Sequence, residues 1–157
     1  MEYSILIKKD ELAHQIDLRT HYHAEKEKRK DLNADVGETS FDDEELLNTF
    51  LNKATNELIA TQAGRLESIS CRMNRDYIEI RFTAGNERRP TLLPILKQAI
   101  NDYLVNELMT QWLLIRYPAW SEHYIAMRNE LFSHVRELFA SFCNRKIRRR
   151  PTNLAGI

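Results

Sequence analysis

Three histidines near the start of the chain, His14, His21 and His23, are the residues whose type best suits a metal site. His21 and His23 are two positions apart, so on a helix they point in different directions. His14 and His21 share a helix face, but no third ligand follows at a spacing that zinc sites use. We therefore interpret all three as solvated side chains on a polar helix and expect no metal and no other cofactor.

Two cysteines, Cys71 and Cys143, could each act as a nucleophile. The guanidinium of Arg72 beside Cys71 should lower the pKa of that thiol, which favours the reactive thiolate. However, no motif supplies a partner base, and the two cysteines are too far apart in sequence for a redox pair or a disulfide framework. We expect free thiols on small buried residues, in a reducing compartment.

A run of four carboxylates, Asp42, Asp43, Glu44 and Glu45, could in principle perform acid–base catalysis. Consecutive residues fan around a helix end, so they do not face each other across a cleft and stay too exposed for tuned pKa values. The chain has only four glycines. It contains no phosphate-binding loop, dinucleotide fingerprint or zinc-protease motif. We therefore expect no enzymatic activity.

Five basic residues gather near the end of the chain: Arg145, Lys146, Arg148, Arg149 and Arg150. Such a run could neutralise several phosphates of a nucleic acid. No aromatic residues are interleaved with it, so base stacking is not indicated. The alternative is a helix C-terminus whose free carbonyls attract cations. Both interpretations stay open, and the five residues are candidates for contact with a partner or with DNA.

Aromatic residues flank Pro118: Trp112 and Tyr117 precede it, and Trp120 follows. Core packing at a corner between two helices is the usual role of such residues. The alternative is a partner-binding patch, because Trp and Tyr are enriched among the residues that dominate binding energy. We keep Trp112, Tyr117 and Trp120 as candidate interaction residues.

Periodicity and start signals predict the elements that carry the first of these residues. Residues 3–7 are typical of a short β-strand, and a helix follows from Glu11. The segment 21–40 is almost wholly polar, so we expect a solvated helix end and then a mobile loop. A helix over 42–62 begins with the acidic run and should end near Gly64, a plausible cap.

The second half of the chain begins with the best strand pattern, residues 76–83, in which apolar and polar side chains alternate. We expect it to pair with the strand at 3–7 or with the residues just before it, because an isolated strand leaves backbone groups unpaired. Two long helices follow and should pack antiparallel about Pro118. The first is apolar on most sides over 95–115, which indicates a central helix or one that faces a partner. The second presents an apolar seam, made of Trp120, Tyr124, Met127, Leu131, Val135, Leu138 and Phe142.

Length and composition set the class of protein. The chain has 157 residues, of which 43% are hydrophobic and 29% charged. We expect a mostly α fold, a bundle of three to four helices with a small two-stranded β element. It should form one domain over residues 1–147, followed by a flexible basic tail over 148–157. The formal net charge of zero argues against a whole-domain attraction to nucleic acid or to an anionic membrane. No apolar stretch reaches the roughly 18 residues of a membrane span, and the start of the chain lacks a signal-peptide pattern.

Several segments together resemble a group of small proteins from prophage structural gene clusters. The segments are SILIKKDEL, DDEELLNTFLNKA, DYIEIRF, NDYLVNELMTQWL, the aromatic-rich final helix and RKIRRRP, within residues 3–151. Such proteins are similar to head–tail connector, or adaptor, components of tailed bacteriophages. The resemblance implies a helical, non-catalytic protein that forms a ring between portal and tail. The polar insertion at 21–40 and the longer final helix depart from a typical small adaptor, so tail completion or another virion role also stays open.

Two functions from different classes follow. In the first, the apolar surface of the last two helices exceeds what one copy can hide, and the protein assembles with itself and with neighbouring virion proteins. Its location would be the bacterial host cytoplasm during assembly and then the virion. The basic tail would reach a neighbour or packaged DNA, and no small-molecule substrate is expected. The alternative is a nucleic-acid-binding regulator of a mobile element that uses the basic C-terminal segment. The neutral net charge and the lack of a glycine turn in YPAW make it the second choice.

Overall fold

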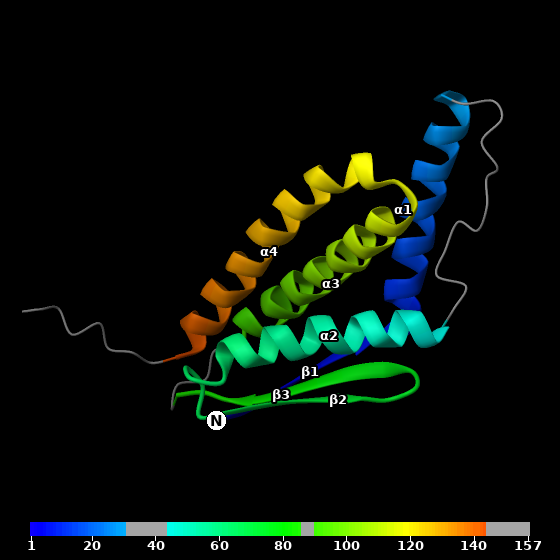
Figure 1. Ribbon diagram of the computed structural model, residues 1–157. Helices are drawn as coiled ribbons and strands as arrows, with labels where there is room; N and C mark the ends of the chain where they lie inside the picture. The colour runs from blue at the N-terminus through cyan, green and yellow to red at the C-terminus, as the bar shows by residue number, and fades with distance from the viewer. Residues whose placement is uncertain (31–43, 86–89, 144–157) are drawn as a thin grey trace, which may run out of the picture.

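The computed structural model describes residues 1–30, 44–85 and 90–143, with only the backbone described over 27–30 (Figure 1). Its first element, the strand β1 (Glu2–Lys8), runs directly into the helix α1 (Lys9–Lys30). The backbone N–H of Lys9 donates to the carbonyl of Asp76 at 2.9 Å, which ties this junction to the sheet. The described elements are mostly α-helical, as the sequence predicts.

The sheet has three antiparallel strands in the order β1-β3-β2, with β3 (Tyr77–Thr83) in the centre and β2 (Ser68–Met73) on the far side. The prediction of two strands is therefore wrong, because both of the partners considered for residues 76–83 pair with it at once. In register, Ile5 and Cys71 lie on either side of Ile80. The backbone N–H of Asn74 donates to the carbonyl of Tyr77 at 2.9 Å and closes the β2–β3 hairpin.

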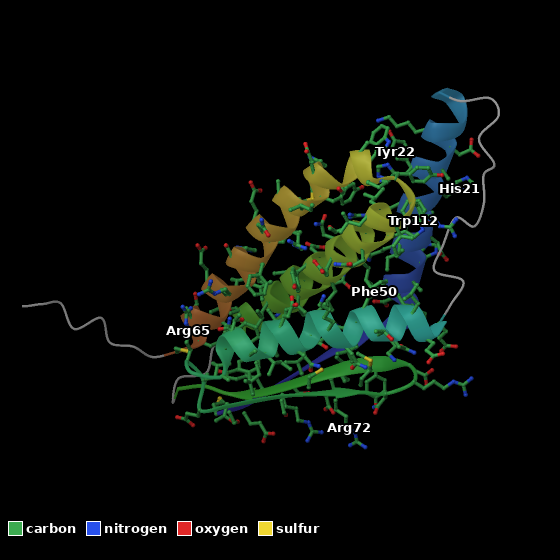
Figure 2. All side chains as sticks on the ribbon, viewed as in Figure 1. His21, Tyr22, Phe50, Arg65, Arg72 and Trp112 are labelled. Carbon is green, nitrogen blue, oxygen red and sulfur yellow. The ribbon has the colours of Figure 1, made fainter. Side chains whose placement is uncertain are left out.

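Alternation of side chains gives the sheet one apolar and one polar face. Ile5, Ile7, Ile78 and Ile80 are each at most 2% exposed and face the helices. The other face carries polar residues such as Arg72, which points away from the helices (Figure 2). All four α-helices lie on the apolar side (Figure 1). An antiparallel sheet tolerates this arrangement because its second face can remain in water.

The helix α3 (Leu92–Arg116) lies at the centre of the helical layer. The helix α2 (Glu44–Gln62) crosses it, α1 packs along its other side, and α4 (Ser121–Phe142) returns antiparallel to it. Almost every α3 side chain between Tyr103 and Leu113 is buried. The chain itself thus covers the middle of this apolar surface, whereas Ile95, Leu114 and Ile115 at its two ends stay exposed. The central-helix interpretation of the 95–115 pattern therefore holds for its middle, and its two ends remain open to a partner.

The chain after His21 differs from the prediction of a loop over 21–40. The helix α1 continues to Lys30, while residues 31–43 lie outside the described part. Thr20 and Ala24 are buried and extend the stripe of Leu12 and Ile16 at steps of four residues. Since Glu, Lys and Arg are good helix formers, a polar sequence with one packed stripe remains helical.

The remaining element boundaries agree closely with those predicted from the sequence. Over its described residues, α2 matches the helix expected at 42–62. Gly64 does not form a left-handed cap, because Gly85 is the one described glycine with a positive φ, 42°. In α4, Val135 and Phe142 are buried as predicted, and Phe139, which the predicted seam omitted, is 0% exposed. None of the helices in the described ranges is long and apolar enough to cross a bilayer.

Four aromatic rings join the sheet to the end of α4. The ring of Phe82 lies 5.0 Å from that of Tyr3, 5.2 Å from that of Phe139 and 5.3 Å from that of Phe142. The Tyr3 pair is stacked, and the other two are edge-on, as aromatic rings prefer. The ring of Tyr3 also lies 5.0 Å from that of Phe142, so Phe82 on the central strand and Tyr3 on β1 together join the sheet to α4.

We predict that Phe82→Ala lowers the free energy of unfolding by about 3–5 kcal/mol, since it leaves a cavity among three other rings. Tyr77→Ala is the matched control, because Tyr77 lies on the opposite face of the same strand and is 37% exposed. It should cost less than about 1 kcal/mol. Urea unfolding followed by circular dichroism measures both. Equal losses for the two variants would contradict this account of the core.

Candidate interaction surface

A tight corner joins α3 to α4. The N–H of Tyr117 donates to the carbonyl of Leu113 at 2.7 Å and ends α3. Pro118 then starts a short 3-10 helix, η1 (Pro118–Trp120), where its missing N–H costs nothing. The hydroxyl of Ser121 donates to the carbonyl of Pro118 at 2.7 Å. These local bonds place Tyr117 and Trp120 at one end of the helical layer.

The second half of α1 packs against this corner. His23 Nε2 and the hydroxyl of Tyr124 share a hydrogen bond of 2.7 Å. The His23 ring also lies 5.7 Å from the ring of Trp120, edge-on. The ammonium of Lys26 sits 4.4 Å from the centre of the Trp120 ring, within the range of a cation–π contact. Polar residues of α1 therefore attach it to the corner.

The histidines separate into two groups. His14 and His21 are exposed, as expected. His23 is only 8% exposed, so its interpretation as a solvated histidine is wrong. The reason is the continuation of α1 past His21, which brings His23 onto the buried stripe. Among the described residues, no group of three or more His, Cys, Asp or Glu side chains is placed to hold a metal ion.

The three aromatic candidates have different environments. Trp112 is 4% exposed and its ring lies 5.5 Å from that of Tyr117, so it belongs to the core (Figure 2). Tyr117 and Trp120 are half-buried and keep part of their surface accessible. Of the two interpretations of these residues, core packing fits Trp112, while the other two can contribute to a contact.

Exposed apolar side chains gather near the same corner. Tyr22 is 63% exposed, Leu114 44% and Ile115 60%. Leu114 and Ile115 lie in the last turn of α3, which ends at Arg116 just before the corner. Tyr22, labelled in Figure 2, lies on α1 next to His23. We call this end of the molecule, with Tyr22, Leu114, Ile115, Tyr117 and Trp120, the corner end. Large apolar side chains left in water near one another are a feature of binding surfaces.

A second apolar site lies at the other end of α3. Ile95 is 50% exposed and lines an open hollow of about 360 Å³ between α3 and α4. Pro94 and Ala99 add apolar surface, and Asp102 and His134 add polar groups. We call it the Ile95 hollow. Ile95 and Ile115 are separated along α3 by about 30 Å, at 1.5 Å of rise per residue.

The two cysteines are free and partly buried, in different surroundings. Cys71 is half-buried on the inner sheet face, and burial raises the pKa of its thiol, although a hydrogen bond with Thr55 opposes this. The expectation that Arg72 lowers this pKa is wrong, because neighbouring strand residues point to opposite faces. The thiol of Cys143 donates to the carbonyl of Arg65 at 3.3 Å.

The charged clusters are only partly described. Glu44 and Glu45 occupy the first turn of α2, where they complement the helix dipole. Asp42 and Asp43 lie outside the described residues. So do all five basic candidates, namely Arg145, Lys146, Arg148, Arg149 and Arg150.

Tyr22 belongs to the corner end, and His23 and Lys26 contact its Trp120. Sequence reasoning did not give them this role because it ended the packed part of α1 too early. The available signal was the step of four residues from Leu12 to Ala24, interrupted by polar Thr20. Comparisons of the chain with known protein families, curated proteins and solved structures each found no match.

We predict that Tyr124→Phe lowers the free energy of unfolding by about 0.5–1.5 kcal/mol, the usual net contribution of one hydrogen bond. Burial raises the pKa of the Tyr124 phenol above its ordinary value of 10. The folded state therefore holds this proton more tightly than the unfolded state, so the wild type should lose stability as pH rises above 10. The variant should lose less over the same range. Tyr22→Phe, at an exposed tyrosine, is the control, and identical pH profiles for wild type and Tyr124→Phe would contradict the prediction.

Proposed function

We propose that the protein is a non-enzymatic assembly protein of a tailed-phage virion, a head–tail connector that works as a ring of identical copies. The observation that carries this proposal is the presence of apolar sites at both ends of α3. One is the corner end, with Ile115 60% exposed, and the other is the Ile95 hollow, with Ile95 50% exposed. The resemblance of the chain to prophage connector proteins supports the same role.

Two different sites at opposite ends of one rigid helix favour head-to-tail contact. In a two-fold dimer the same patch meets itself, whereas a ring requires two distinct patches that fit each other. In the proposed ring, an apolar side chain of the corner end enters the Ile95 hollow of the next copy. Aromatic and aliphatic side chains that fill a neighbour's pocket commonly dominate such contacts. The intervening part of α3 is buried in its own copy and would transmit the geometry without bending.

The proposal extends to the partners and location. Portal and tail proteins would bind the two rims of the ring, and the basic run from Arg145 to Arg150 would reach a neighbouring protein or packaged DNA. Contact of that run with phosphates would weaken steeply as salt rises. The protein would assemble in the cytoplasm of a bacterial host and remain in the virion.

The first test is self-association measured by light scattering after size-exclusion chromatography. The wild type should form species larger than the 18.6 kDa chain as its concentration rises. The double variant Ile115→Ser with Tyr22→Ser should prevent self-association by removing the corner end. Ile95→Ser should prevent it by removing the Ile95 hollow. Leu6→Ser is the matched control, because Leu6 is 47% exposed but lies on the outer face of the sheet. It should assemble like the wild type.

Mixing the two interface variants distinguishes a head-to-tail contact from a two-fold one. Each variant keeps the site that the other has lost, so an equimolar mixture should give a pair of chains that cannot grow further. A two-fold contact through either end would not be restored by mixing. A wild type that stays strictly monomeric at high concentration, and that does not bind purified portal rings, would refute the proposed function.

A further inference from the structure

A polar cleft of about 310 Å³ lies between α2, α3 and α4, away from both ends of α3. Its deepest charged group is the carboxylate of Glu107, which is only 6% exposed. The amide of Gln111, one turn further along α3, donates to Glu107 Oε1 at 3.0 Å. The second oxygen, Oε2, lies 3.4 Å from Arg128 Nη1 on α4 and has no hydrogen bond.

This carboxylate is incompletely satisfied for a buried charge. Buried charged groups normally have both an ion-pair partner and hydrogen bonds to their remaining lone pairs. An ion pair with Arg128 explains why Glu107 is tolerated and how α4 is held to α3. It does not supply the donor that Oε2 lacks. Oε2 itself has almost no accessible surface, so what Glu107 contributes to the cleft is the negative charge of its carboxylate beside Gln111 and Arg128.

The rim of the cleft carries a second pair of opposite charges. Lys53 and Glu57 are exposed on α2, four residues apart, and both line the cleft. Together with Arg128 and Glu107 they give two positive and two negative groups around one space. A simple anion would be repelled by the two carboxylates, and a simple cation by the two basic groups. A molecule that carries one positive and one negative group close together would be attracted to both kinds of side chain.

One wall of the cleft is aromatic. The rings of Tyr103 and Phe132 lie 5.3 Å apart at an angle of 49°. Burial raises the pKa of the Tyr103 phenol, and the carboxylates of Glu107 and Glu57 raise it further. The phenol therefore stays neutral and adds no charge to the cleft. Because Tyr103 is almost fully buried, Phe132 is the ring on which an apolar side chain of a ligand can pack while its charged groups face the ion pairs.

We propose that the cleft binds a free α-amino acid. The ammonium group lies near the carboxylates of Glu57 and Glu107, while the carboxylate group faces Arg128 and Lys53. The space of about 310 Å³ is at the lower end of ligand pockets, which suits a molecule of this size. The proposal concerns binding without reaction, and it goes beyond the proposed assembly role, on which it does not depend.

The test is isothermal titration of the full chain with glycine, L-leucine, L-phenylalanine and L-glutamate, one at a time, each up to about 10 mM. This range covers the millimolar affinity expected from so few contacts. At least one amino acid should bind saturably. Its analogues without the amino group and without the carboxylate should each bind about 10-fold more weakly, because each loses its attraction to the oppositely charged side chains of the cleft.

Two variants locate the site. Glu107→Gln keeps the shape of the side chain and should weaken binding about 10-fold, and Lys53→Met, at an exposed rim position, should weaken it to a lesser degree. Glu130→Gln on α4 is the control, since Glu130 is exposed and does not line the cleft. If Glu107→Gln fails to fold, Lys53→Met decides.

Absence of saturable binding by all four amino acids would overturn the proposal. So would analogues that bind as well as the parent, or equal effects of the cleft and control variants. Self-association is measured separately, so either proposal can fail without the other.

Discussion

Burial of the middle of α3, from Tyr103 to Leu113, is the constraint on which the rest of the structure depends. A helix that is apolar around most of its circumference must be enclosed, and here α1, α2, α4 and the sheet enclose it. Each of these elements has its own apolar stripe, and each stripe is directed to α3 or to the sheet beneath it. The sheet needs only one apolar face as a result. The free apolar side chains of α3 are left at its two ends, where the covering elements stop.

Enclosure also requires that the polar groups of α3 find partners inside the protein. Asn106 is 0% exposed, and its amide donates to the carbonyl of Tyr124 at 2.8 Å. Thr110 donates to the carbonyl of Asn106, also at 2.8 Å. The pair of Glu107 with Arg128 lies on the same side of α3. The Thr110 bond stays within α3, whereas the contacts of Asn106 and Glu107 reach α4 and help define how it lies on α3.

Local sequence patterns predicted where helices and strands occur better than they predicted what these elements pack against. The strand at 76–83, the helix at 42–62 and the corner at Pro118 could be found because alternation, capping and proline act over a few residues. The strand before residue 76 was offered only as an alternative to pairing with residues 3–7, because local patterns do not show that the central strand has a partner on each side. The second half of α1 could not be found, because His23 gains its contact from Tyr124, about a hundred residues away. Trp112 and Trp120 have the same residue type and different burial for the same reason. The cleft at Glu107 could not be predicted at all, because its residues come from three helices and form no motif in the sequence.

The cleft at Glu107 lies along α3 between the corner end and the Ile95 hollow. Glu107 lies about 12 Å along α3 from Ile115 and about 18 Å from Ile95, at 1.5 Å per residue. The cleft opens toward α2 and α4, whereas the Ile95 hollow is shared by α3 and α4 alone. Contacts at the ends of α3 therefore leave the cleft accessible, and a small ligand in the cleft covers neither end. This separation follows directly from the buried helix, because only surfaces that the enclosing elements leave open can bind another molecule.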